Sequence, residues 1–208
     1  MKFPQFVAIG LILVSYSGGD GCAIRLYREL RRCDALWGHD AEVAVGPQGG
    51  NAYNISQLIR YCRNPSGERV GDCMTDAYAQ CDPGWGEEER PVFQSQAYFL
   101  ARGIEYLCSE VDVIERDRSC INGVATELTE CERASVREFD ESFQELQQHD
   151  PVPWSENRRL LERMGRYREQ CVKDLFSEQC NLHLGQVFGN FLYGVGVHAF
   201  DNRNRNLR

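Results

Sequence analysis

Cysteines placed on the apolar stripes of amphipathic helices constrain this chain of 208 residues more than any other feature. Residues 55–62 carry apolar side chains at the i, i+3, i+4, i+7 spacing of one helical face, and Cys62 is the last of them. Residues 70–81 repeat that spacing with Cys73 and Cys81, and turn residues close each run. The cysteines therefore face neighbouring helices, and disulfide bridges between helices are expected.

A third apolar stripe predicts a long helix over residues 120–146, with Cys120 and Cys131 on one face. A separation of 11 residues on a continuous helix corresponds to roughly 16 Å along its axis. A disulfide needs Cα atoms within about 7 Å of each other. Cys120 and Cys131 are therefore predicted to bond to other helices and not to each other.

Short turns predict two of the pairings. Two helices joined by a short turn run antiparallel, so the turn at residues 64–67 predicts a Cys62–Cys73 bridge. The same reasoning predicts Cys108–Cys120 across a turn at residues 115–118. The remaining six cysteines are expected to tie non-adjacent helices together, with their connectivity left open: Cys22, Cys33, Cys81, Cys131, Cys171 and Cys180.

The rest of the chain is also helical in pattern. Residues 20–36 and 92–113 have helical spacing, and no stretch alternates as a strand does. The predicted fold class is all-α, a disulfide-stapled bundle of about six to seven helices. Residues 20–208 form one helical disulfide-rich domain. Repeated cysteine spacings indicate an internal duplication with halves near 20–85 and 86–208, and chance likeness between helical stripes is the alternative.

Residues 1–19 have the parts of a secretory signal peptide, namely Lys2, an apolar run at residues 6–14 and small residues after it. A membrane anchor is the alternative, but this apolar run is too short to span a bilayer. The expected location is secreted and extracellular, where disulfides persist. The formal net charge of −8 disfavours nucleic acid as a partner, because an acidic protein repels phosphate.

Asn54 begins the one N-glycosylation sequon of the chain, Asn54-Ile55-Ser56. The same residue stands where the N-cap of the following helix belongs. Glycosylation and capping are expected to compete for this side chain, and glycosylation is the favoured prediction.

We find no sequence pattern for catalysis, a cofactor or a metal. The four histidines, His39, His149, His183 and His198, lie far apart, and only His183 has a cysteine, Cys180, at helical spacing. His39-Asp40 resembles a catalytic dipeptide, but without flanking ligand motifs we interpret it as a loop pair. The predicted site residues are therefore the ten cysteines and Asn54, and the protein is expected not to be an enzyme.

The run at residues 183–200 is the most apolar part of the expected mature chain, and Gly185 and Gly189 in it would permit a close helix crossing. Docking of this terminal helix into the core is the favoured interpretation. A membrane-active or self-associating helix is the alternative.

The order of these cysteines resembles that of the insect 27 kDa hemolymph glycoprotein family. The likeness covers residues 55–143 and resumes over residues 166–200, where Gln170-Cys171-Val172 and Cys180 form the late pair. The C-terminal arginine-rich tail departs from the family, which tends to have a further cysteine there. The resemblance implies a secreted, glycosylated, helical body-fluid protein, with no catalytic residues to transfer.

Two classes of function follow. The first is a non-enzymatic extracellular glycoprotein that binds a lipid-like ligand or another protein. The second is a secreted venom or salivary effector that acts on a foreign target or membrane through the helix at residues 184–200. A disulfide-stabilised hydrolase is a more distant alternative.

Overall fold

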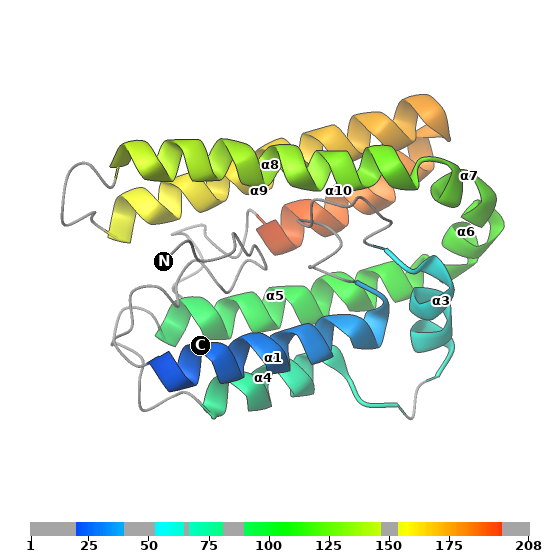
Figure 1. Cartoon of the computed structure of the whole chain (residues 1–208). Helices are drawn as coiled ribbons and strands as arrows, with labels where there is room; N and C mark the ends of the chain where they lie inside the picture. The colour runs from blue at the N-terminus through cyan, green and yellow to red at the C-terminus, as the bar shows by residue number, and fades with distance from the viewer. Residues whose placement is uncertain (1–19, 40–52, 65–66, 81–89, 147–153, 197–208) are drawn as a thin grey trace.

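Nine helices make up the part of the chain that the computed structural model describes, which is residues 20–39, 53–64, 67–80, 90–146 and 154–196 (Figure 1). They are α1 (Asp20–Trp37), α3 (Ile55–Arg63), α4 (Val70–Ala79), α5 (Arg90–Ser109), α6 (Val111–Arg116), α7 (Arg118–Gly123), α8 (Ala125–Leu146), α9 (Trp154–Gln179) and α10 (Leu182–Gly196). The predicted all-α, disulfide-stapled fold is confirmed. The extra helices relative to the expected number are the short α6 and α7.

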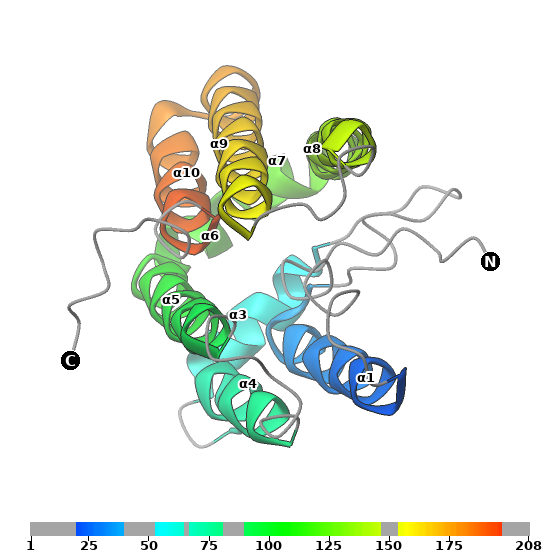
Figure 2. The ribbon, with the colours of Figure 1, turned by 90° about the vertical axis from the view of Figure 1, so that its left-hand side faces the viewer.

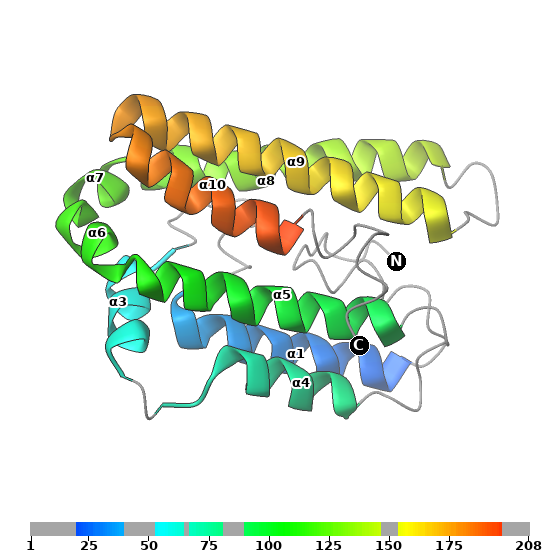
Figure 3. The ribbon, with the colours of Figure 1, turned by 180° about the vertical axis from the view of Figure 1, so that it is seen from behind.

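The helices form two layers that are joined at one end. In the lower layer of Figure 1, α4 contacts both α1 and α5, and in the upper layer α9 contacts both α8 and α10. α3 lies across one end of the lower layer, and α6 and α7 lead from that end up to α8. α5 packs against α10, so these two helices connect the layers along one side (Figures 2 and 3).

A hydrophobic core extends through both layers. Burying one large apolar side chain stabilises the fold by about 1.5–3 kcal/mol. The largest fully buried side chains come from α1, α4, α5, α6, α7, α8, α9 and α10: Leu26, Val70, Ile104, Leu107, Ile114, Ile121, Leu128, Leu161, Phe176 and Leu184. The stripes that the sequence pattern identified are therefore the surfaces that meet in the core.

The C-terminal helix α10 packs into this core, as favoured from its sequence. Leu184, Phe188 and Phe191 are all buried, and a Cβ added at Gly185 would lie 2.7 Å from the carbonyl oxygen of Lys173 on α9. α9 and α10 therefore cross closely because residue 185 has no side chain. None of the helices among the described residues is long and apolar enough to cross a membrane.

The predicted continuous helix over residues 120–146 is wrong, because the backbone leaves the helical conformation at Val124. Gly123 ends α7, and glycine is a poor helix former. Cys120 consequently lies in α7 and Cys131 in α8. The turn expected at residues 115–118 is only a one-residue junction at Asp117, whose N–H still bonds to the Val113 carbonyl in helical fashion.

Four disulfides connect helices within the described part of the chain. They are Cys33–Cys73 between α1 and α4, Cys62–Cys108 between α3 and α5, Cys120–Cys180 between α7 and the end of α9, and Cys131–Cys171 between α8 and α9, with Cα–Cα distances of 5.0–5.8 Å. Among the residues with described side chains, no cysteine is a free thiol. Cys81 and the side chain of Cys22 lie outside the described part of the structure.

Both pairings predicted from short turns, Cys62–Cys73 and Cys108–Cys120, are wrong. The second assumed a turn at residues 115–118, where the structure has a one-residue junction at Asp117. The first assumed that α3 and α4 form an antiparallel hairpin. α4 instead packs on α1 and α5, while α3 packs on α1, α5 and the short helices. Each of these cysteines therefore bonds to a cysteine on a helix that lies beside its own in the folded chain, and not to one across a short turn. The broader prediction that the cysteines bridge different helices is confirmed.

Candidate functional site

Two buried polar side chains and a largely buried arginine, from distant parts of the chain, meet between the two layers. Tyr53 precedes α3, Glu132 lies on α8 and Arg168 on α9. The Tyr53 hydroxyl donates a hydrogen bond to Glu132 Oε1. Arg168 donates from Nε to the same oxygen and from Nη2 to the Tyr53 hydroxyl, each at 2.6 Å. This triad ties the segment before α3 to the α8–α9 pair.

Burial and charge fix the protonation of the triad. Burial raises the pKa of Tyr53 far above its usual value, and the Glu132 carboxylate adds to that shift, so Tyr53 is a neutral phenol that can donate. Burial by itself lowers the pKa of Arg168, but the charge of Glu132 and the contact with Tyr53 together raise it above its usual value. The charges of Glu132 and Arg168 therefore balance each other within the interior.

A second polar group lies at the end of α1. The carboxylate of Asp34 is buried and accepts a hydrogen bond from Trp37 Nε1 at 3.3 Å. His39 places its Nδ1 3.6 Å from Asp34 Oδ2, and only 10% of each side chain is exposed. That distance is too long for a hydrogen bond but close enough for the carboxylate to act on the imidazole electrostatically. Burial, with a smaller contribution from the same carboxylate, raises the pKa of Tyr78 on α4, so that Tyr78 is also neutral.

The other imidazole nitrogen, His39 Nε2, is buried and has no hydrogen-bond partner. Buried polar atoms are nearly always paired, since an unpaired one costs about 1–3 kcal/mol. His39 therefore has an unpaired ring nitrogen inside the protein.

Aromatic rings hold His39 in place and connect it to the triad. The Trp37 and His39 rings stack at a centroid distance of 5.2 Å, and the Tyr53 ring lies 5.0 Å from His39. Phe191 of α10 meets Trp37 edge-on at 5.7 Å. Asp34, His39 and the Tyr53–Glu132–Arg168 triad are therefore parts of one cluster, which we call the interlayer cluster (Asp34, Trp37, His39, Tyr53, Glu132, Arg168 and Phe191).

Gly38 provides the turn that brings His39 beside Tyr53. It has a φ of 92°, in the left-handed region that favours glycine, and a Cβ there would lie 2.5 Å from the Asn54 carbonyl oxygen. The Asn54 N–H donates to the Gly38 carbonyl at 2.7 Å, beside an antiparallel bridge between His39 and Tyr53. The two segments that supply the aromatic rings are therefore fixed to each other by backbone hydrogen bonding.

Asn54, the predicted glycosylation site, is exposed and caps α3, with its Oδ1 accepting from the Gln57 N–H at 3.0 Å. The expected competition between capping and glycosylation does not follow from this geometry. Capping uses the side-chain oxygen, whereas an N-linked glycan is attached to the side-chain nitrogen. Ser56 of the sequon accepts a hydrogen bond from Arg118 Nη2 at 2.6 Å.

The other residues considered for catalysis or metal binding do not form a site among the described residues. His183 is exposed, with its Nε2 3.6 Å from Glu110 Oε2, and its neighbour Cys180 is bonded to Cys120. The described side chains contain no group of three or more potential metal ligands. Asp40, His149 and His198 lie outside the described residues.

The sequence interpretation of His39 as part of a loop pair missed the interlayer cluster altogether. One signal for the cluster was available in the sequence. Glu132 follows Leu128 by four positions, and Arg168 precedes Cys171 by three, so each charge interrupts an apolar helical stripe. Opposite charges on two otherwise apolar stripes indicate a buried ion pair.

No family model matches this sequence, and no curated protein and no solved structure matches it either. The functional proposal is therefore argued from the sequence and structure of this chain.

Proposed function

We propose that this chain is a secreted, non-enzymatic extracellular glycoprotein that binds a lipid-like ligand or another protein. The observation that carries the proposal is the set of four described disulfides, two of which join helices of the lower layer and two of which join α7 and α8 to α9. Disulfides of this number form and persist in oxidising compartments and are rare in reducing ones. The resemblance in cysteine order to the insect 27 kDa hemolymph glycoprotein family adds a body fluid as the expected compartment.

The position of the sequon supports the glycoprotein part of the proposal. Asn54 is exposed at the start of α3, and its nitrogen is not used in capping. A glycan at this position would extend from the surface without removing the helix cap. A single N-linked glycan is therefore the expected modification.

The burial of the interlayer cluster supports a binding function over a catalytic one. Asp34 and His39 form the carboxylate–imidazole half of a general-base arrangement. However, a base must come within hydrogen-bond reach of its substrate, and Nε2 is enclosed. The burial of this nitrogen therefore argues against turnover of an external substrate.

The effector function remains the alternative proposal, and it would require α10 to leave the core. The apolar stripe of α10 is buried at Leu184, Val187, Phe188, Phe191, Leu192 and Val195. Release would expose this stripe and break the close packing at Gly185. This requirement makes the effector the second choice.

Expression in insect cells with residues 1–19 retained tests the proposal. The protein should accumulate in the medium, should have no titratable thiol when denatured without reductant, and should lose the mass of one glycan on treatment with an N-glycosidase. Asn54→Gln and Ser56→Ala should each abolish the glycan. Asn64→Gln, which changes an asparagine outside any sequon, is the control and should keep it. Retention of the protein inside the cell, or two or more free thiols, would contradict the proposal.

A further inference from the structure

The four described disulfides do not cross-link the two layers to each other. Two of them join helices of the lower half, which we define as the described residues up to Ser109, and two join helices of the upper half, the described residues from Arg118 onward. In that order they are Cys33–Cys73, Cys62–Cys108, Cys120–Cys180 and Cys131–Cys171. Within the described part of the chain, the halves are therefore joined covalently by the backbone of α6 and its junction with α7.

We propose that the molecule opens as two disulfide-stapled halves that pivot at Asp117, and that the hydroxyl group of Tyr53 is the latch that keeps them closed. Hinges are formed by a few residues at the ends of elements, and Asp117 is the one residue between α6 and α7. The opening requires no described disulfide to break.

The contacts on the two sides of Asp117 make it the pivot. On one side, Arg63 of α3 bonds to both Asp112 and Glu115, so α6 is attached to the lower half. On the other side, the Cys120–Cys180 bridge attaches α7 to the end of α9 in the upper half. α6 and α7 are each only six residues long, and helices this short depend on such attachments for their stability.

The pair α5–α10 forms the side that stays closed. These helices pack extensively across the layers, and a Cβ added at Gly103 on α5 would lie 2.8 Å from Val195 Cγ2 on α10. In Figure 2, α5 and α10 lie on one side of the molecule, and α1 and α8 lie on the other. The side with α1 and α8 is therefore the one that separates.

The latch lies on the side that separates. Tyr53 in the lower half donates a hydrogen bond to Glu132 and accepts one from Arg168. Glu132 and Arg168 are both in the upper half, so opening removes the two hydrogen bonds of Tyr53 but leaves the ion pair intact. The edge-on contact between Trp37 and Phe191 also joins the halves, and opening exposes both rings.

The charges beside the latch lower the cost of opening. Only 13% of the Arg168 side chain and 8% of the Glu132 side chain are exposed, so the pair has lost most of its hydration. Opening returns water to the pair without separating it, and this gain offsets part of the loss of the two hydrogen bonds. The apolar contact between α5 and α10 has no comparable gain, because exposing apolar surface to water is unfavourable.

Hydroxyl-radical footprinting of the intact, disulfide-bonded protein tests this inference residue by residue. Tyr53→Phe keeps the ring but removes the latch hydroxyl. We expect the labelling of Trp37 and Phe191 to rise about tenfold, because hydrogen bonds to charged groups are worth at least that factor. Met74 and Phe176, which are buried within the lower and the upper half, should keep their wild-type labelling.

Two further tyrosine variants are matched controls. Tyr106→Phe removes a hydroxyl that accepts from Asn190 between α5 and α10, on the side that stays closed. Tyr61→Phe removes a hydroxyl that accepts from the Val70 N–H within the lower half. Both variants should leave the labelling of the Trp37 and Phe191 rings unchanged.

The wild-type protein provides a second measurement that does not depend on how Tyr53→Phe folds. In urea below the unfolding midpoint, Trp37 and Phe191 should become labelled at lower concentrations than Met74 and Phe176. Simultaneous labelling of all four, or unchanged labelling of Trp37 and Phe191 in Tyr53→Phe, would overturn the inference. So would a disulfide between the halves in non-reducing peptide maps. Secretion and glycosylation are measured separately, so these results leave the proposed function untouched.

Discussion

The two layers of the molecule have the same helix order but different interiors. In the lower layer α4 contacts α1 and α5, and in the upper layer α9 contacts α8 and α10. The first and second helices of each trio are bridged by a disulfide, Cys33–Cys73 below and Cys131–Cys171 above, and both bridges span 40 residues. This correspondence is what an internal duplication would produce, but the layers divide after α5 (Arg90–Ser109) and not near residue 85, where the sequence pattern placed the boundary between the halves.

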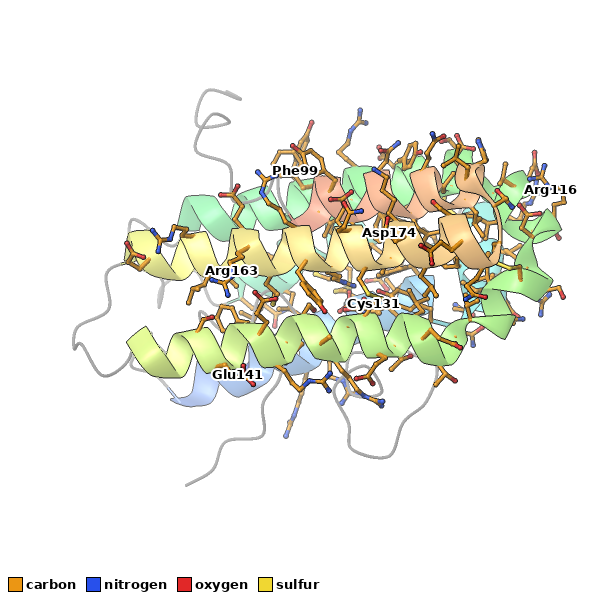
Figure 4. All side chains as sticks on the ribbon, turned by 90° about the horizontal axis from the view of Figure 1, so that it is seen from above. Phe99, Arg116, Cys131, Glu141, Arg163 and Asp174 are labelled. Atoms are coloured by element: carbon orange, nitrogen blue, oxygen red, sulfur yellow. A yellow bond between two sulfur atoms is a disulfide. The ribbon has the colours of Figure 1, made fainter. Side chains whose placement is uncertain are left out.

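The difference between the layers lies in what surrounds these two bridges. Cys33 and Cys73 are both almost completely buried, and Asp34, next to Cys33, is the one buried polar residue described on α1 and α4. Near Cys131, in contrast, α8 buries three polar residues, Thr129, Glu132 and Ser135. In Figure 4, Cys131 and Arg163 lie between α8 and α9, while Glu141 points away from α9. Similar cysteine frameworks thus hold a helix pair with one buried polar residue in the lower layer and a pair with three in the upper layer.

Complete reduction is expected to have the largest effect, because it removes the links of both layers at once. Each bridge contributes roughly 2–4 kcal/mol, so the four described bridges together are comparable with the stability of about 5–15 kcal/mol of a typical domain. The reduced protein should therefore lose most of its stability, and its Tm should fall sharply. Thermal unfolding followed by circular dichroism, with and without reductant, measures this. An unchanged Tm would show that packing alone holds both layers together.

Arg168→Met, a substitution in the upper layer, should cause the next largest loss of stability. It leaves Glu132 buried without its cation and should lower the free energy of unfolding by about 3–5 kcal/mol. Arg163→Met is the matched control, since Arg163 bonds Glu138 between the same two helices but is 59% exposed. The control should change stability by less than about 1 kcal/mol. Urea unfolding of both variants measures the difference, and equal losses would contradict a special role for the buried pair.

Helices and apolar stripes were predictable from sequence because they depend on local spacing. α1, predicted over residues 20–36, is observed at Asp20–Trp37. The partners of the cysteines were not predictable, because they depend on which helices pack together. Cys62 and Cys73 are close in sequence, yet they bond to Cys108 and Cys33 on other helices.

The interlayer cluster was not predictable from the sequence either, because its contacts also depend on which helices pack together. Its hydrogen bonds join residues 79 and 115 positions apart, Tyr53 with Glu132 and Tyr53 with Arg168. Local patterns can show that Glu132 and Arg168 interrupt apolar stripes, but they cannot show that the two meet Tyr53. Likewise, Gly38 fixes the turn beside His39 only because Asn54 lies against it in the folded chain.

The comparison of the layers also predicts the fifth bridge. In the upper layer a second disulfide, Cys120–Cys180, lies 11 residues before Cys131 and 9 after Cys171. In the lower layer Cys22 lies 11 residues before Cys33, and Cys81 lies 8 after Cys73. α1 and α4 run in opposite directions (Figure 1), so both steps lead the same way along the pair. Cys22 is therefore expected to bond to Cys81.

Peptide mapping under non-reducing conditions should find the Cys22–Cys81 linkage together with the four described bridges. Replacing both cysteines by alanine should lower the free energy of unfolding by roughly 2–4 kcal/mol. A free thiol at either position, or a bridge from Cys22 to another chain, would break the correspondence between the layers.

Glycine substitutions test the helix crossings of the two layers, and their expected effects on stability are smaller. In the upper layer a Cβ at Gly185 would meet the Lys173 backbone oxygen at 2.7 Å, and in the lower layer a Cβ at Gly71 would meet the Ala101 methyl at 2.9 Å. Gly185→Ala should destabilise by about 1–3 kcal/mol because backbone must move. Gly71→Ala should destabilise less, since its one close contact, with the Ala101 Cβ at 2.9 Å, is longer than the contact at Gly185. Gly194→Ala is the control, with open space around it, and should be neutral or stabilising by up to about 1 kcal/mol. Equal Tm shifts for Gly185→Ala and Gly71→Ala would contradict this order.

The smallest expected effect concerns the connection between the layers, at Asp117 between α6 and α7. Hydrogen bonds from Arg116 and from Asn181 Nδ2, the latter at 3.0 Å, hold the pKa of Asp117 below its usual value. Asn181 also uses its Oδ1 to accept from the Leu184 N–H at the start of α10, so the carboxylate links the junction to the upper layer.

Because the folded-state pKa of Asp117 is lower than the unfolded one, its contribution to stability is fully present above the unfolded value of about 4 and is lost as the pH falls through the folded value. Arg116→Met removes the strongest of these hydrogen bonds, so the pKa of Asp117 should rise toward its usual value and the loss of stability below pH about 4 should become shallower. NMR titration of the Asp117 side-chain carbon measures the pKa directly. Arg102→Met, which removes an exposed arginine paired with Glu105 on α5, should leave that titration unchanged. If Arg116→Met also leaves it unchanged, the ion pair with Arg116 does not control Asp117, and Asn181 becomes the main link between the junction and α10.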